Sequence, residues 1–316
     1  AIKVAGVRAL GPDIVFAGTA PEHRHTAALA LASQHGAAMI EPFDHPHIFI
    51  DMGADSEAIC PYCSTLYKHN PALAASQSIP AVAAWADSIE AGTGRRPGFR
   101  ARRRLLENWL RNTLWSLSLA RWSDDDVLRV VRITDADVAK LRDSLAGPGM
   151  VAALPHMGSW DFAGAWCARV GIKVVSVAER LPEGLFERFR DARAGMGMTI
   201  YPVDQPDLMR RLGDDVRAGR LVCLLADRDL SARGLAVAWP GGGELRVPAG
   251  PALLARRIGA DLRVVTTHFD GGRLEIRISD PVPGDSAAEL MTGVVAGFAD
   301  AVRDDPSNWL MLRRAL

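Results

Sequence analysis

This 316-residue sequence contains no long apolar run. None approaches the roughly 20 apolar residues that a membrane-spanning helix needs, and the N-terminus lacks the basic, apolar and small-residue regions of a signal peptide. Lys+Arg and Asp+Glu balance at 37 each, so net charge points neither to nucleic acid nor to a membrane. The four cysteines suggest no disulfide framework. These absences predict a cytosolic or peripheral protein.

The composition fits a globular chain with room for one large domain and a smaller one. Hydrophobic residues make up 48% and charged residues 23% of the sequence, as expected of packed domains. A chain of 316 residues also exceeds what one small core needs. Because the first part differs in pattern from the rest, we expect an N-terminal region at 1–77 and a larger domain at 78–316.

From about residue 100 onward, short apolar runs alternate with helical patterns. Two helices, at 102–120 and 135–146, are expected before the first strand of this part, at 150–154. Further strands are expected at 173–177, 199–203, 221–226, 262–269 and 274–278, with helices at 184–196, at 207–218 and from Pro248. This alternation predicts an α/β fold with a mixed central β-sheet, helices on both faces and a small N-terminal extension.

A histidine and an aspartate five positions apart follow the strand predicted at 150–154. His156 lies at the carboxyl end of that strand, where open α/β sheets bind ligands, and helical spacing begins at Trp160. Asp161 is expected to hold one imidazole nitrogen, which leaves the other free as a base. The pattern lacks the nucleophilic serine or cysteine of a triad. A substrate hydroxyl that attacks an acyl donor is therefore the expected nucleophile.

Spacing alone does not decide between catalysis and structure. A helix carboxylate that merely holds a structural histidine gives the same pattern, so the motif needs a fitting context. Two more strand ends carry charged pairs: Glu179 with Arg180, and Asp227 with Arg228. An ordinary surface ion pair is the alternative for Glu179 and Arg180.

Arginines crowd a short segment beside a helix rich in leucine and tryptophan. They are Arg95, Arg96, Arg100, Arg102, Arg103 and Arg104. One face of the helix carries Leu106, Trp109, Leu110, Leu114 and Leu117. A helix lying at a membrane interface has this character. A core-packing helix with a solvated basic flank gives the same pattern.

Several blocks, taken in order, resemble the lysophospholipid acyltransferase superfamily, in the branch that holds the lipid A late acyltransferases. The blocks lie at 154–166, 177–181, 189–197, 225–230, 247–251 and 308–312. Ordered blocks at compatible spacing are more specific than any single motif. The resemblance covers the chain from about residue 78 to residue 316.

The resemblance implies roles for individual residues. His156 is the base, oriented by Asp161 as in a serine triad whose serine is replaced by a substrate hydroxyl. Asp227 stands where the family usually has glutamate, and contacts the acceptor. The residues expected to contact substrate are Arg193, Arg180, Glu179, Arg228 and Ser159. Arginine suits an anionic phosphate, and Ser159 or nearby helix amides would stabilise the oxyanion.

The resemblance further implies a reaction. A fatty acyl chain, palmitoyl in the nearest branch, moves from acyl-CoA to a mannose hydroxyl of phosphatidylinositol mannoside. The implied partners are acyl-CoA, an anionic glycolipid and the inner-membrane surface, without nucleic acid. The expected location is the cytoplasmic face of the cell membrane, held peripherally, and no metal or organic cofactor is required. The alternatives are acylation of a lipid A precursor or a lysophospholipid, and a non-catalytic lipid-binding protein of the same fold.

The N-terminal region resembles another family. Cys60 and Cys63 form a C-x2-C turn within a stretch, 44–69, that resembles a small zinc-finger module, and His45 would be a third ligand. Structural zinc uses four ligands, and the module's additional upstream cysteine is missing. The candidates to replace it are His47, Asp44 and His69. Zinc binding, and with it a zinc-dependent interaction module, is a hypothesis for this region.

Overall fold

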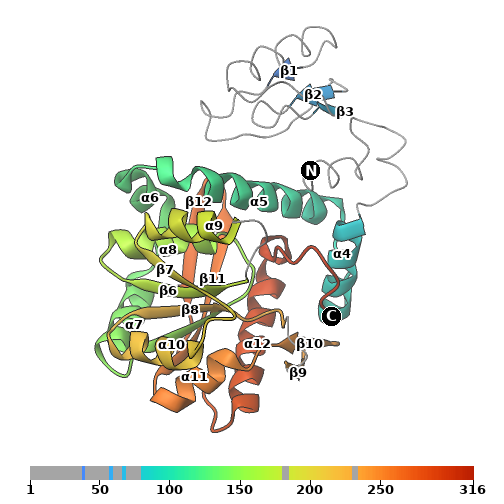
Figure 1. Ribbon diagram of the computed structural model, residues 1–316. Coiled ribbons are helices and arrows are strands. Elements are labelled where there is room, and N and C mark those ends of the chain that lie inside the picture. The colour runs from blue at the N-terminus through green and yellow to red at the C-terminus, as the bar shows by residue number, and fades with distance from the viewer. Residues whose placement is uncertain (1–37, 40–56, 60–65, 69–79, 180–184, 230–233) are drawn as a thin grey trace. The chain divides into compact units, whose positions relative to one another are not determined.

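The computed structural model describes residues 38–39, 57–59, 66–68, 80–179, 185–229 and 234–316 (Figure 1). The chain divides into two units, Ala1–Ile79 and Pro80–Leu316. In the first unit, β1 (Ala38–Met39) pairs in parallel with β2 (Glu57–Ile59), which pairs antiparallel with β3 (Leu66–Lys68).

The second unit begins with helices and then alternates strands with helices. Its first elements are α4 (Pro80–Thr93), α5 (Phe99–Ser118), the 3-10 turn η1 (Leu119–Arg121), α6 (Asp124–Val130), β4 (Val131–Ile133) and α7 (Asp135–Ala146). Next come β5 (Met150–Leu154), α8 (Trp160–Arg169), β6 (Val174–Ala178), α9 (Leu185–Ala194), β7 (Met198–Pro202), α10 (Leu208–Arg217) and β8 (Leu221–Leu225). The last are β9 (Leu235–Ala238), β10 (Glu244–Val247), α11 (Gly250–Ile258), β11 (Asp261–Asp270), β12 (Arg273–Ile278), α12 (Ala287–Asp304) and η2 (Pro306–Asn308).

A seven-stranded sheet forms the centre of this unit, in the order β4-β12-β11-β5-β8-β6-β7. Every neighbouring pair is parallel except β11 and β12, which are antiparallel. The predicted mixed α/β sheet is therefore confirmed. Strand β5 lies inside the sheet between β11 and β8, and all five of its residues are buried, as expected of a strand covered on both faces.

Helices cover both faces of the sheet (Figure 1). Successive residues of β5 point to opposite faces: Met150 lies with Phe162 of α8 in one core cluster, and Val151 lies with Phe298 of α12 in the other. The first cluster also holds residues of α6 and α7, and the second holds residues of α4, α10 and α11. Each such buried side chain contributes roughly 1.5–3 kcal/mol.

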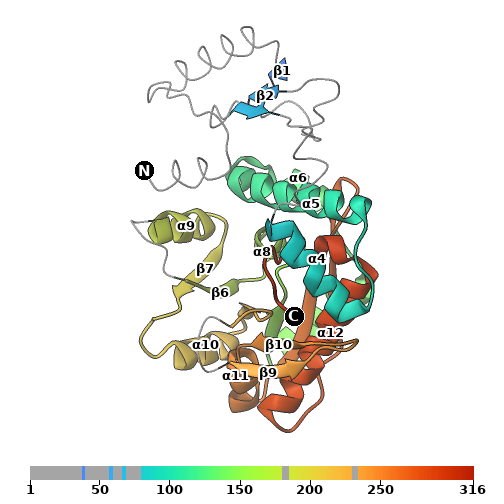
Figure 2. The ribbon, with the colours of Figure 1, turned by 90° about the vertical axis from the view of Figure 1, so that its right-hand side faces the viewer.

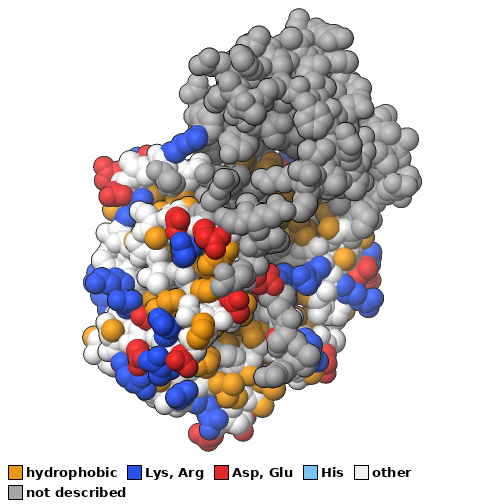
Figure 3. All heavy atoms as spheres, in the orientation of Figure 1, with side chains coloured by type: hydrophobic (Ala, Val, Ile, Leu, Met, Phe, Trp, Pro, Cys, Tyr) orange, Lys and Arg blue, Asp and Glu red, His pale blue; other side chains and the backbone are white. Residues whose placement is uncertain are grey.

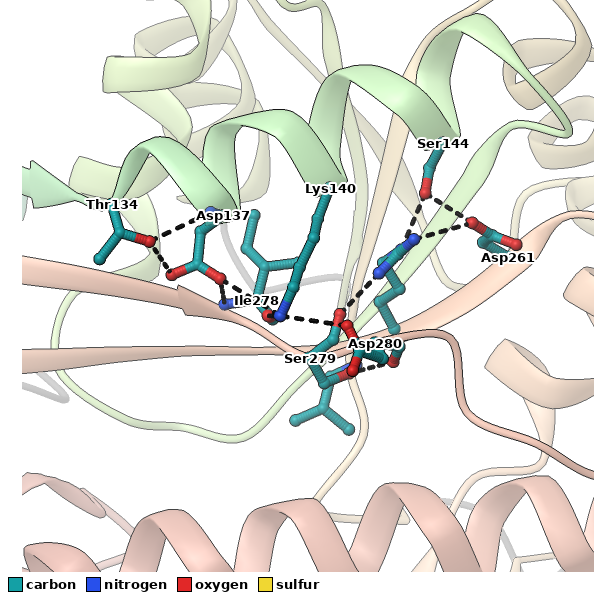
Figure 4. Close-up of polar contacts among 10 residues, drawn as sticks. Thr134, Asp137, Lys140, Ser144, Asp261, Ile278, Ser279 and Asp280 are labelled. Carbon is teal, nitrogen blue, oxygen red and sulfur yellow. Dashed lines mark hydrogen bonds and ion pairs between the residues drawn. The ribbon is translucent and has the colours of Figure 1, made fainter.

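A polar network fastens α7 to strands β11 and β12 (Figure 4). The buried guanidinium of Arg263 donates to Ser144 Oγ (2.8 Å), to the Ser279 carbonyl (2.8 Å) and to Asp261 (3.2 Å). On the same helix, the Lys140 ammonium donates to the Ile278 carbonyl (3.0 Å). Because a buried charge is tolerated only when it is paired and hydrogen-bonded, this network explains how an arginine fits inside a strand.

The β9–β10 hairpin lies outside the central sheet, beside α12 (Figures 1 and 2). Its turn contains the three glycines 241–243, which all have positive φ. Such angles are open to glycine without steric cost. These glycines therefore allow the tight turn that joins β9 to β10. The buried Trp239 follows β9 and packs back toward the core.

Helix α5 presents apolar residues on two sides. Leu105 and Asn108 are buried and face the core, whereas Leu106 packs against it only in part. On the outer side Trp109 is 43% exposed and Phe99, at the helix start, is 80% exposed. Within the predicted leucine and tryptophan stripe, Leu106 therefore packs partly against the core, whereas Trp109 is exposed. Within the described part of the chain, no helix combines the length and apolar content needed to cross a bilayer.

His268 of β11 generates a prediction about acid stability. Burial, together with the charge of Arg277, lowers the pKa of His268 to about 4, against an ordinary value of 6.5. Between those pH values His268 is protonated in the unfolded chain but not in the native state. The free energy of unfolding therefore falls as pH falls. We expect unfolding free energy to drop by about 3 kcal/mol from this group between pH 6.5 and 4.

Urea unfolding of the native protein and of His268→Gln across pH 4 to 7 tests this expectation. Glutamine keeps a hydrogen-bonding partner for Thr266, which lies 3.0 Å from His268 Nε2, but takes up no proton. The variant should lose clearly less stability on acidification than the native protein. Parallel curves for the two proteins would contradict the account.

Candidate active site

The site is set by two neighbouring parallel strands. β5 and β8 pair in register, with Leu154 opposite Leu225, and the Ala226 amide donates to the Leu154 carbonyl (2.8 Å). His156 follows β5 by two residues and Asp227 follows β8 by two residues. The register therefore brings both side chains to the same level at the carboxyl edge of the sheet.

His156 and Asp227 form a close pair. His156 Nδ1 lies 2.5 Å from Asp227 Oδ1, and the His156 amide donates to Asp227 Oδ2 (2.8 Å). An ionised carboxylate only accepts hydrogen bonds, so Nδ1 of the neutral ring carries the hydrogen and Nε2 presents its lone pair. The Asp227 side chain is completely buried, whereas that of His156 is 24% exposed. The arrangement leaves one ring nitrogen able to accept a proton.

The carboxylate of Asp227 stays ionised in spite of its burial. Desolvation opposes ionisation, but attraction to His156 and hydrogen bonds from His156 and Trp309 outweigh it, so the pKa of Asp227 lies below its ordinary value. The indole Nε1 of Trp309 donates to Asp227 Oδ2 (2.8 Å). A negative charge is thus kept beside the imidazole, with Asp227 Oδ1 2.5 Å from His156 Nδ1.

The turn that carries His156 is tightly held. Gly158 adopts a positive φ of 53°, and a Cβ at this position would lie 2.4 Å from the carbonyl oxygen of Thr267. The Thr267 hydroxyl donates to the Met157 carbonyl (2.6 Å) and accepts from the Ser159 amide (3.0 Å). Only glycine fits both the angle and the close approach, so the turn fixes where His156 stands.

The predicted pairing of His156 with Asp161 is wrong. Asp161 lies in the first turn of α8 and binds Arg193 of α9 through two contacts, Nε to Oδ1 (2.9 Å) and Nη2 to Oδ2 (2.5 Å). Both side chains are largely buried. The Arg193 fork matches the carboxylate in a bidentate pair, while the ring of His156 bonds Asp227 on the adjacent strand.

Ser159 is the residue before α8 and is fully buried. Its amide is taken by Thr267 (3.0 Å), so this amide does not point to a ligand. Its hydroxyl oxygen has no hydrogen-bond partner within the described residues. The first helical hydrogen bond runs from Ala163 to Ser159, which leaves the amides of 160–162 at the helix start without intrahelical acceptors.

The other predicted substrate contacts lie along the same edge. Arg228 follows Asp227 and donates to Glu179 (3.0 Å), which follows β6. Both side chains are partly exposed. Arg180 lies outside the described residues. Glu179 therefore has Arg228 as a partner, and a pair of Glu179 with Arg180 lies outside the described residues.

Two tryptophans at the site were given no role from the sequence. Trp309 bonds Asp227 as described, and Trp160 places its ring edge-on to that of His156, with centroids 5.3 Å apart. The block at 308–312 marked Trp309 only as part of a resemblance. A tryptophan beside a terminal turn gives no signal for a carboxylate partner, because the contact joins distant parts of the chain.

Neither of the two described cysteines, Cys167 and Cys223, is suited to act as a nucleophile. Burial raises the pKa of Cys167 to about 12, and burial likewise raises the pKa of Cys223. Thiols that stay protonated are inert. Within the described residues, no cluster of His, Cys, Asp and Glu side chains could hold a metal ion. The zinc candidates His45, Cys60 and Cys63 lie outside these residues.

Comparison with known proteins adds an independent line of information. Residues 36–67 match a family described as a zinc-finger domain. The chain is 37% identical over 175 residues to the phosphatidylinositol mannoside acyltransferase of Mycobacterium tuberculosis (strain ATCC 25618 / H37Rv), an alignment covering 53% of this chain and 54% of that protein. It is 38% identical over 178 residues to the protein of the same name from Mycolicibacterium smegmatis (strain ATCC 700084 / mc(2)155), covering 53% and 57%.

The chain thus spans about half the length of the curated relatives it matches. Residues 105–316 match the family described as bacterial lipid A biosynthesis acyltransferase, which confirms the resemblance seen in the ordered sequence blocks. Since this match covers most of the chain, the protein belongs to the bacterial lipid A biosynthesis acyltransferase family.

Proposed function

We propose that this protein transfers a fatty acyl chain, palmitoyl, from acyl-CoA to a mannose hydroxyl of phosphatidylinositol mannoside. The observation that carries the proposal is the His156–Asp227 pair at the carboxyl edge of the sheet, 2.5 Å apart, with Nε2 of the histidine unengaged by the carboxylate. The names of the matched relatives support this acceptor and this reaction.

The geometry of the pair supports the following reaction. Nε2 of His156 takes the proton of the acceptor hydroxyl while its oxygen attacks the carbonyl carbon of the thioester. The tetrahedral intermediate then breaks its C–S bond, and the imidazolium returns the proton to the departing thiolate. Asp227 holds Nδ1–H throughout and stabilises the imidazolium, as the aspartate of a serine triad does.

The start of α8 is the proposed oxyanion site. The helix dipole favours negative charge there, and the amides of 160–162 precede the first helical hydrogen bond. The buried Ser159 hydroxyl, which lacks a partner among the described residues, is a further donor. Donors that are already in place stabilise the developing charge without reorganisation.

Headgroup binding is better matched by Arg228 than by Arg193. The Arg228–Glu179 pair is partly exposed, and such pairs are worth only about 0–1 kcal/mol, so a phosphate replaces Glu179 at low cost. Arg193 is instead committed to Asp161 in a largely buried bidentate pair. We assign Asp161 and Arg193 to joining α8 and α9 beside the site.

A lipid A precursor is the rival acceptor, because the family match carries that description. The test is transfer from radiolabelled palmitoyl-CoA, with phosphatidylinositol mannoside and a lipid A precursor offered in separate reactions. Label on the mannoside supports the proposal. Label on the lipid A precursor alone would reassign the acceptor.

The same assay tests the base. His156→Ala should lower transfer roughly a hundredfold or more, because general-base catalysis is lost. His268→Gln is the matched control, since His268 is buried on β11 and contacts Thr266; it should keep native activity. Equal transfer by the native protein and by His156→Ala would contradict general-base catalysis by His156. It would favour a lipid-binding protein of this fold.

The assignment of Asp161 predicts loss of stability. Asp161→Asn removes the Asp161 charge from its buried pair with the Arg193 guanidinium, and should lower unfolding free energy by about 3 kcal/mol. The double variant Asp161→Asn/Arg193→Met removes both charges and should recover part of that loss. Urea unfolding of four proteins, namely the native protein, Asp161→Asn, Arg193→Met and the double variant, measures the coupling. Additive losses in the double variant would show that the two side chains are not coupled.

The outer side of α5 is the proposed membrane contact. Phe99 and Trp109 are exposed apolar groups there. Arg103 pairs with Glu107 (2.7 Å) and Arg104 lies 4.0 Å from Asp305, but both arginines are more than 60% exposed, which leaves their charges available to anionic headgroups. Apolar side chains beside arginines are the pattern of interfacial helices.

A rival surface lies over α10 and α11, where Figure 3 also shows basic and apolar side chains next to one another. A hollow of about 520 Å³ there is lined by Met209, Leu253, Arg256 and Arg257. Leu253 is 47% exposed, which matches the exposure of Trp109. This similarity makes Leu253→Ser a fair control for the α5 surface.

We expect Phe99→Ser/Trp109→Ser to weaken binding to vesicles that contain phosphatidylglycerol by roughly tenfold, because two large apolar groups no longer insert. Leu253→Ser should bind like the native protein. Co-sedimentation at several vesicle concentrations measures both. If Leu253→Ser weakens binding while the α5 variant does not, the docking surface is on α10 and α11 instead.

A further inference from the structure

The orientation of the Asp227 carboxylate depends on few groups. His156 supplies two contacts, one from the ring to Oδ1 and one from its amide to Oδ2. Among the residues that the structure describes, the other side chain bonded to this carboxylate is Trp309, whose indole donates to Oδ2 (2.8 Å). Trp309 is thus a second donor to Oδ2, beside the His156 amide, and it comes from outside the His156 loop.

Trp309 is itself held in place. Its ring stacks on that of Trp239, with centroids 5.5 Å apart and planes 16° from parallel. Its backbone forms an antiparallel bridge with Met157, next to His156. The indole therefore stands in a single orientation against Asp227, without the rotamer freedom that would weaken its hydrogen bond.

The residues on either side of Trp309 also form hydrogen bonds with the turn that carries His156. The Leu310 amide donates to the His156 carbonyl (2.7 Å), and the Gly158 amide donates to the Asn308 carbonyl (3.1 Å). The Asn308 side chain in turn accepts from the Phe269 amide of β11 (2.7 Å). One short segment, 308–310, thus contacts both members of the pair, by backbone on the His156 side and by the indole on the Asp227 side.

We propose that Trp309 is a positioning residue for the His156–Asp227 pair, its indole N–H holding the Asp227 carboxylate in the orientation that His156 needs. The inference rests on the proposed acyl transfer for its kinetic consequence. The hydrogen bond itself is testable without any activity. Trp309 does not touch substrate in this account; it acts through Asp227.

Trp309→Phe and Trp85→Phe form a matched pair of variants. Trp85 is completely buried in the same core cluster as Trp309, but its indole nitrogen has no hydrogen-bond partner within the described residues. Both variants lose the same atoms from the same core. Trp309→Phe should lower kcat roughly tenfold to a hundredfold, as expected for the loss of a hydrogen bond to a charged group, with KM little changed. Trp85→Phe should keep native kcat.

A spectroscopic measurement separates this inference from the proposed function. The chain has eight tryptophans, and the indole N–H signals of Trp309 and Trp85 are identified in proton–nitrogen correlation spectra by their loss in the two variants. In Asp227→Asn the Trp309 signal should shift strongly, because its acceptor loses its charge, while the Trp85 signal stays in place. A Trp309 signal that does not move, or native kcat in Trp309→Phe, overturns the inference. Absence of transfer by the native protein, with the Trp309 shift observed, overturns the proposed function alone.

Discussion

The in-register pairing of β5 with β8 is the constraint on which the site depends. Leu154 opposite Leu225 sets the level of both strand ends, and the two residues that follow each strand carry His156 and Asp227 to the same edge. A one-residue slip of either strand would send its side chains to opposite faces. The buried apolar residues on both faces of β5 resist such a slip, so the packing of the core also holds the geometry of the His156–Asp227 pair.

Burial divides the charged pairs of this edge by role. Asp227 is fully buried and keeps its charge through His156 and Trp309. Asp161 and Arg193 are also largely buried and join two helices. Arg228 and Glu179 are partly exposed and weakly coupled. Arg228 is therefore the arginine of this edge that the proposal assigns to an anionic headgroup, because its present pair is the most exposed of the three.

Local patterns predicted the local features well. The bounds expected for α7 and β5 agree with the structure. Helix caps, glycines and apolar runs determine such bounds, and these signals lie in adjacent residues of the sequence. The position of His156 at a strand end followed from the same signals. Its partner did not: Asp161 is close in sequence, whereas Asp227 becomes close only through the order of the strands. The available signal was that His156 and Asp227 each lie within two residues of the end of a predicted strand. The contact of Trp309 and the outer face of α5 likewise depend on packing between distant segments.

The pairing of His156 with Asp227 is tested most directly by the tautomer of His156. Nitrogen chemical shifts of the imidazole ring measure this tautomer. In the neutral ring the hydrogen should lie on Nδ1 and not on Nε2, a state that persists in Asp161→Asn and is lost in Asp227→Asn. Asp227 accepts the Nδ1 hydrogen at 2.5 Å, and no other carboxylate is needed. If the tautomer is unchanged in Asp227→Asn but lost in Asp161→Asn, then Asp161, and not Asp227, is the partner of the imidazole.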